Sequence, residues 1–160
     1  NNVEVGDRSP SPLSTVWLNR ELAMENTYLL SMKAHIAEIE ADLKGLTTIL
    51  NERPMSRYEA KASERLIQTL VEACIGIAKH RCKQLGYPAP DNAYVAFERL
   101  SEHDVASMKS INWKRIIGMR NALVHDYLNI NPEIIEQLIR ENEYSSLVAF
   151  AQEELVALGS

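Results

Sequence analysis

The sequence predicts an all-α protein, an up-and-down helical bundle of four main helices and one short one. Apolar residues recur at helical spacing over long stretches, and no stretch alternates apolar and polar residues as a strand does. The 160 residues, 46% of them hydrophobic, suffice for one domain with a buried core. Residues 24–160 are interpreted as this domain. Residues 1–23, with Gly6, Pro10 and several serines, are interpreted as an N-terminal arm or a vector-derived extension.

The first two helices are the long ones. One is expected from Leu29 to Leu50, where the apolar residues form a narrow stripe, and Pro54 follows its end. The other is expected from about Ser56 to Leu85, because Gly86 and Pro88 then supply a stop signal. These two helices should form the frame of the bundle.

The second half of the chain contains three further helix signals. A short helix is expected from Asp91, its N-cap, through Leu100. Asp104 is a candidate cap for a fourth helix, at about Val105–Tyr127. The run Asn131-Pro132-Glu133 combines an N-cap, a proline at the first helical position and an acid in the first turn. It should begin a last helix that runs toward Leu158.

Composition limits the classes of function. Seventeen Lys and Arg against 22 Asp and Glu give a net charge of −5, so a nucleic-acid site must be local. Cys74 and Cys82 lack the close pairing of a zinc site and are expected to be packing residues, with no metal or cofactor. No apolar run approaches the roughly 20 residues that span a bilayer. We therefore expect a soluble, cytoplasmic protein with no membrane partner.

One segment departs from the acidic average. Residues 105–125 contain no Asp or Glu, whereas Lys109, Lys114, Arg115 and Arg120 all lie there. The segment predicts a locally positive field. An alternative is that this acid-poor helix packs against acidic neighbours elsewhere in the fold.

The end of this segment combines groups suited to phosphodiester chemistry. At about 100° per residue, Arg120, Asn121, Val124, His125 and Tyr127 fall within roughly 160° of arc. Arginine binds phosphate through two parallel hydrogen bonds and offsets charge that develops during transfer. Histidine titrates near neutral pH and can move a proton to or from a ribose oxygen. RNA supplies its own nucleophile, the 2′-hydroxyl, so this chemistry requires no metal.

The whole pattern resembles the HepT toxins of the HEPN superfamily. Residues 116–127 are similar to the signature Arg-x4-His-x-Tyr, here Arg120, His125 and Tyr127. Several other segments resemble the family in the same order, and the resemblance covers about Met24–Leu158. These segments are Arg57-Tyr58, Glu64-Arg65-Leu66, Glu72-Ala73-Cys74, residues 77–80, residues 94–100 and residues 131–135.

The resemblance implies a metal-independent ribonuclease toxin that folds as a HEPN helical bundle and forms a homodimer. Arg120 would bind the scissile phosphate of an RNA, a tRNA or an mRNA, with His125 as general acid or base and Asn121 orienting the site. The family's partner is MntA, a nucleotidyltransferase antitoxin of a type VII system that adds AMP to the signature tyrosine, here Tyr127. The sequence departs from many relatives at Asp126, where they have Gly.

Other interpretations stay open at this point. Trp113, Lys114 and Arg115 are candidates for substrate binding, with the indole of Trp113 as a surface on which a base can stack. Alternatively, Trp113 packs in the core or in a dimer interface. The chain could also be a catalytically silent HEPN partner or substrate-binding subunit of a nucleotidyltransferase. In a third interpretation it is a plain dimeric interaction module, with Arg120 and His125 bonded inside the fold.

Overall fold

A computed structural model describes residues 12–88, 90–103, 111–125 and 130–160. The described residues form helices and no strand, which confirms the predicted all-α class. The helices are α1 (Pro12–Glu52), α2 (Arg57–Gln84), α3 (Ala93–Glu102), α4 (Trp113–His125), α5 (Pro132–Arg140) and α6 (Ser145–Leu158).

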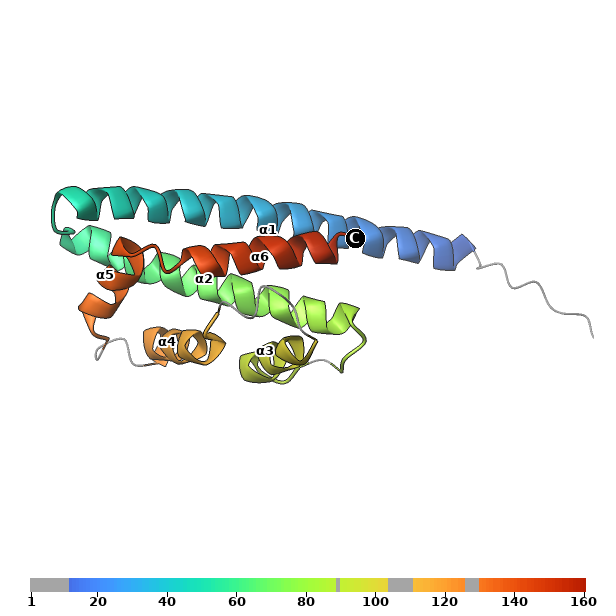
Figure 1. Ribbon diagram of the computed structural model, residues 1–160. Helices are drawn as coiled ribbons and strands as arrows, with labels where there is room; N and C mark the ends of the chain where they lie inside the picture. The colour runs from blue at the N-terminus through green and yellow to red at the C-terminus, as the bar shows by residue number, and fades with distance from the viewer. Residues whose placement is uncertain (1–11, 89, 104–110, 126–129) are drawn as a thin grey trace, which may run out of the picture.

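The bundle is organised around α2, which contacts each of the other five helices. Figure 1 shows α1, α6 and α2 running side by side, with α3 and α4 on the side of α2 away from α1. Both faces of α2 are therefore covered, and Leu70, Val71 and Ile77 are fully buried. Cys74 and Cys82 are buried as well, as the sequence predicted, and desolvation raises the pKa of the Cys74 thiol to about 12.

The predicted start and end of α2 are confirmed. The Ser56 hydroxyl accepts a hydrogen bond from the Glu59 backbone N–H at 3.1 Å, and Glu59 accepts one from the Ser56 N–H at 2.8 Å. This capping box satisfies two N–H groups that a helix end otherwise leaves unpaired. Arg53 holds the same carboxylate at 2.7 Å, and Gly86 follows the helix in the left-handed region at φ 84°.

Two of the predicted helix starts were wrong. Asn92 caps α3 in place of Asp91, because its side chain accepts a hydrogen bond from the Val95 N–H at 3.0 Å. The helix α4 begins at Trp113, later than the predicted Val105, since Asn112 accepts one from the Arg115 N–H at 3.1 Å. The other proposed cap, Asp104, lies outside the described residues, as does the predicted end of this helix at Tyr127.

The predicted last helix is in fact two helices. Its start is confirmed, because Asn131 caps α5 through the Glu133 N–H at 3.0 Å. The chain then turns at Asn142, which has φ 53°, and α6 begins a few residues later. Tertiary contacts hold this turn: the buried Tyr144 hydroxyl lies 2.7 Å from the Asn142 side-chain oxygen and 3.0 Å from Thr47 Oγ1.

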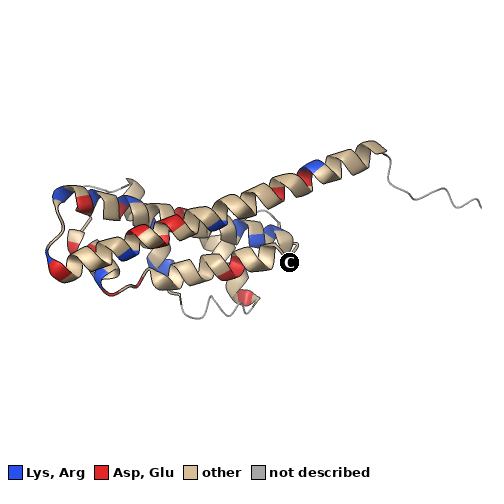
Figure 2. Ribbon diagram, turned by 90° about the horizontal axis from the view of Figure 1, so that it is seen from above, with Lys and Arg blue, Asp and Glu red and all other residues tan. Residues whose placement is uncertain are grey.

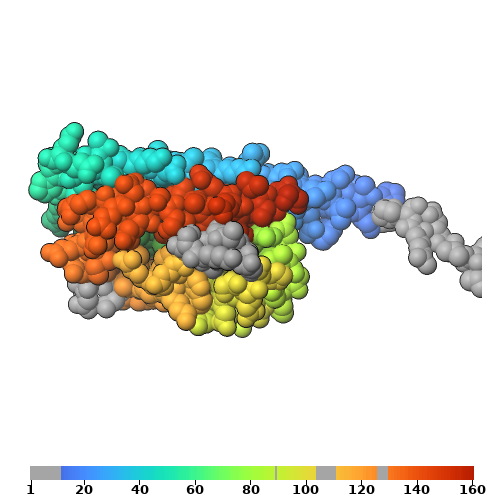
Figure 3. Space-filling view, viewed as in Figure 1, coloured from blue at the N-terminus to red at the C-terminus, as the bar shows by residue number. Residues whose placement is uncertain are grey.

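The first helix is longer than predicted. It starts at Pro12 and not near Leu29, so part of the segment expected to be an arm is helical. Its buried residues begin only at Ile36. Figure 3 shows the N-terminal part of α1 projecting beyond the body of the molecule.

Candidate active site

The predicted site residues lie on α4, whose apolar side packs into the bundle. Ile116 and Leu123 are buried, and α4 packs against α2 and α3. The Trp113 ring lies 4.9 Å from the ring of Tyr94 and 6.3 Å from that of Phe97. The Trp113 ring thus packs against two aromatic rings of α3, and Lys114 Nζ lies 5.5 Å from it.

The Arg120 side chain lies at the edge of the buried side of α4, with 23% of its surface exposed. Its Nε is 3.5 Å from Glu72 Oε1 on α2, which is an ion pair but too long for a good hydrogen bond. This Nε is buried and has no hydrogen-bond partner among the described residues. The guanidinium is therefore held loosely by one carboxylate.

The other predicted residues face solvent. Asn121 and His125 are exposed, and helical spacing places them with Lys114 on one stripe, since seven and eleven residues correspond to nearly whole turns. Arg120 lies about 140° around the helix from His125, so the two flank one side of α4. Among the described residues, no hydrogen bond or ion pair joins these two side chains. Tyr127 and Asp126 lie outside the described residues.

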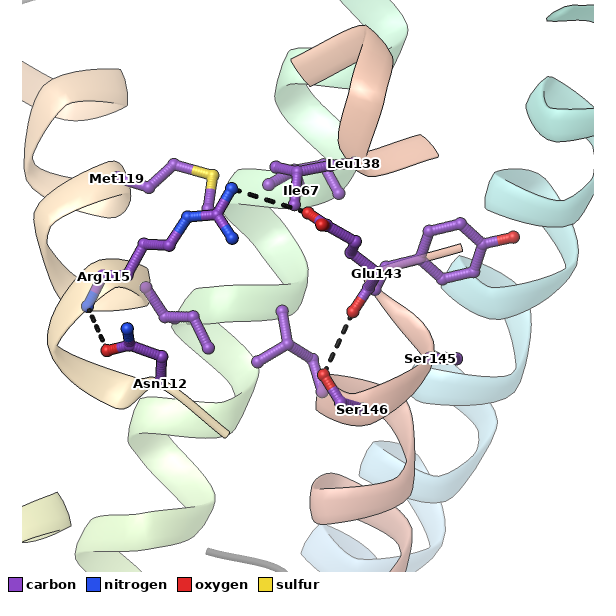
Figure 4. A pocket seen from close by; sticks show the side chains of 11 residues that line it. Ile67, Asn112, Arg115, Met119, Leu138, Glu143, Ser145 and Ser146 are labelled. Atoms are coloured by element: carbon purple, nitrogen blue, oxygen red, sulfur yellow. Dashed lines mark hydrogen bonds and ion pairs between the residues drawn. The ribbon is translucent and has the colours of Figure 1, made fainter. Parts of the chain in front are cut away.

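Arg115 takes part in a separate hollow between α4 and the α5–α6 turn. Its Nη2 lies 3.5 Å from Glu143 Oε2, and both residues line a cavity of about 300 Å³. Figure 4 shows the Arg115 side chain crossing the cavity toward Glu143, with Asn112 at the start of α4 and Ser146 on the far wall. Arg115 and Lys114 are both exposed, but the Arg115 guanidinium is paired with Glu143.

Two acids therefore belong to this region that the sequence reasoning did not include, Glu72 and Glu143. Each pairs with one arginine of the acid-free segment, as the alternative interpretation of that segment expected. In the sequence, Glu72 belongs to a segment that resembles the family, whereas no pattern pointed to Glu143. Figure 2 shows basic and acidic segments interspersed over the bundle and not gathered into one basic face.

The described residues contain no group of three His, Cys, Asp or Glu side chains placed to hold a metal ion. Likewise, none of the helices over these residues combines the length and apolar character of a bilayer span.

The helical bundle and the Arg-x4-His spacing on α4 are those of a HEPN-type protein. The family model described as "Ribonuclease HepT-like" matches residues 32–154, so the chain belongs to the HepT-like family. The chain is also 26% identical to the "mRNA nuclease HepT" of Shewanella oneidensis over 111 residues, which cover 67% of this chain and 84% of that protein. No solved structure gave a significant match.

Proposed function

We propose that the protein is a metal-independent endoribonuclease, the toxin of a type VII toxin–antitoxin system that acts on RNA in the cytoplasm. Membership of the HepT-like family and the similarity to a protein named an mRNA nuclease support this class of activity. The observation that favours α4 as the site is its exposed stripe of Lys114, Asn121 and His125 next to the half-buried Arg120.

The proposed reaction is a phosphoryl transfer within the RNA. The 2′-oxygen attacks the adjacent phosphorus, the P–O bond to the 5′-oxygen breaks, and a cyclic phosphate and a 5′-hydroxyl result. His125 takes the 2′-hydroxyl proton or gives a proton to the leaving oxygen. Arg120 binds the phosphate and Asn121 orients it, while Lys114 binds the neighbouring backbone. Two proton transfers need two groups, which a homodimer supplies if the α4 helices of both subunits face one cleft.

The test compares His125→Ala and Arg120→Ala with the matched controls His35→Ala and Arg140→Ala, whose side chains are exposed on other helices. Purified protein is incubated with RNA in the presence of a chelator, and growth arrest is scored in cells. We expect His125→Ala to lose about 10²-fold or more of the cleavage rate, the usual contribution of general acid–base catalysis. Both α4 variants should keep the helical circular dichroism of the wild type. Undiminished cleavage by either would exclude the assigned role.

We further propose that an MntA-like nucleotidyltransferase inactivates the toxin by adding AMP to Tyr127, two residues beyond His125. A bulky anionic group there would block and repel an RNA phosphate. Co-expression with a cognate MntA-like nucleotidyltransferase should add the mass of AMP to the peptide that contains Tyr127. Inhibition of the toxin with an unmodified Tyr127 would refute this mode of control.

A second candidate is a catalytically silent partner subunit of a nucleotidyltransferase. The ion pair between Arg120 and Glu72 favours it, because a paired arginine can be structural. The two candidates differ in one result. A silent subunit would form a stable complex with the nucleotidyltransferase and would leave RNA intact even when it is purified without that partner.

A further inference from the structure

The N-terminal part of α1, Pro12 to Ser31, is an apolar helix with little packed against it. Trp17 is 60% exposed, Met24 is 71% exposed, and Leu18 and Leu22 are also largely exposed. The match to the HepT-like family begins at Met32, so this stretch lies outside it. In Figure 2 the projecting helix is mostly neither acidic nor basic. Exposed apolar surface of this kind marks an interaction site in a protein that folds stably.

A hollow of about 560 Å³ lies where this helix leaves the bundle. It is lined by Glu21, Glu25 and Tyr28 of α1, by His80 and Lys83 near the end of α2, and by Leu158 at the end of α6. We call it the α1 slot. Figure 1 shows α6 ending while α1 continues past it, so the slot prolongs the path of α6.

The walls of the slot suit an aromatic side chain and a cation. The Tyr28 and His80 rings lie with their centroids 4.3 Å apart and their planes tilted by 33°, so one wall of the slot is aromatic. Among the residues that line the slot, Glu21 and Glu25 each carry a negative charge and Lys83 carries one positive charge, so a further positive charge would be favourable there. Helical spacing puts Trp17, Glu21 and Tyr28 on one stripe of α1, since four and eleven residues are close to whole turns.

We propose that a second copy of this chain docks its own projecting helix in the α1 slot, antiparallel to α1, so that each copy fills the slot of the other. An antiparallel pair is related by a two-fold axis, and one set of contacts is then made twice. If Trp17 of the second copy reaches the level of Tyr28, the axis passes between Leu22 and Ala23. Arg20 of the second copy then lies level with Glu25 and within about one turn of Glu21.

The helix dipoles favour this direction of the docked helix. Tyr144 at the start of α6 contacts Thr47 of α1, and Gly159 after its end lies near Leu29, so α6 runs antiparallel to α1. The docked helix has the same direction as α6, and its first turn lies beside the last turn of α6. The positive end of one helix dipole then faces the negative end of another, which is favourable.

This contact is separate from the proposed catalytic cleft. In Figure 1, α4 lies on the opposite side of α2 from α1. The α1 slot therefore pairs two copies whether or not the α4 helices also meet, and the proposal does not depend on nuclease activity.

Light scattering on the full chain tests the proposal through two charge substitutions on the same helix. Trp17→Glu places a carboxylate in the slot of the other copy, whereas Leu30→Glu changes a side chain that is 68% exposed and points away from the slot. We expect the wild type and Leu30→Glu to have twice the molar mass of Trp17→Glu over a dilution series, with equal helix content. An equal mass for all three proteins, or an equal decrease in both variants, would overturn the proposal.

Cross-linking then tests the orientation. Glu21→Cys places a thiol in the slot near the two-fold axis, and Asn19→Cys places one on the far side of α1. The native Cys74 and Cys82 are buried and should not react with a short bis-maleimide. We expect covalent dimers from Glu21→Cys and few from Asn19→Cys. Equal cross-linking of both, or cross-linking of neither, would exclude an antiparallel pair in the slot.

Discussion

Replacing Glu72 by alanine measures how much the ion pair with Arg120 contributes to the proposed cleavage of RNA. The pair is long, at 3.5 Å, and Glu72 is 47% exposed, so solvent screens it. Pairs of this kind contribute about 0.2 to 1 kcal/mol. A factor of ten in rate corresponds to about 1.4 kcal/mol. Loss of the ion pair that holds Arg120 in place should therefore lower the cleavage rate by between about 1.4-fold and about 5-fold.

The assay is the initial rate of cleavage of one RNA, with kcat and KM determined separately. We expect Glu72→Ala to lower kcat within this range, and Glu72→Gln to lower it less because the amide oxygen keeps a polar contact with Arg120 Nε. Glu64→Ala, on the same helix and paired at 3.9 Å with Lys61, is the control and should leave the rate unchanged. A loss of about 10²-fold in Glu72→Ala would show that this acid takes part in proton transfer, and the reasoning from a screened ion pair would be wrong.

Two further predictions concern stability. Arg81→Ala removes the guanidinium whose Nε lies 2.7 Å from Glu154 Oε2, between α2 and α6, where the Glu154 side chain is only 3% exposed. Loss of one member of a buried pair costs about 3 to 5 kcal/mol, which corresponds to a fall in Tm of roughly 6 to 20 °C, whereas Arg140→Ala should change Tm little. The second prediction concerns Glu59, whose pKa the Arg53 hydrogen bond and the Ser56 N–H lower to about 2. Its stabilising effect is full above the usual carboxyl pKa of 4.5 and is lost as pH falls from there toward 2, so Glu59→Gln should flatten acid unfolding in that range.

The helices that the sequence predicts well are those whose signals are local. The start of α2 depends on Ser56 and Glu59, three residues apart, and the start of α5 on Asn131 and its two successors. The break between α5 and α6 depends on Tyr144 bonding to Thr47, a residue far away in the chain. No local pattern contains that contact, and the sequence therefore predicted one helix where two exist.

In the candidate site, too, the sequence predicts what depends on neighbouring residues and misses what depends on distant ones. Arg120, Asn121 and His125 share a short segment, and their spacing and chemistry could be recognised together. The carboxylates that neutralise the arginines could not, because Glu72 lies on α2 and Glu143 in the α5–α6 turn. The absence of acids from residues 105–125 predicted a positive field, but each arginine on α4 meets an acid from another element. Only the folded chain shows that the charge on this helix is largely compensated.

That compensation decides how RNA must bind if the proposed nuclease is correct. Arg120 can engage a phosphate only if it loosens its contact with Glu72. The exchange is favourable, since a bidentate, charge-assisted bond to phosphate is stronger than a screened contact of 3.5 Å. The buried Nε also lacks a hydrogen-bond partner among the described residues, and a phosphate oxygen could satisfy it. Glu72 thus holds Arg120 beside the exposed stripe without binding it so tightly that substrate fails to displace it.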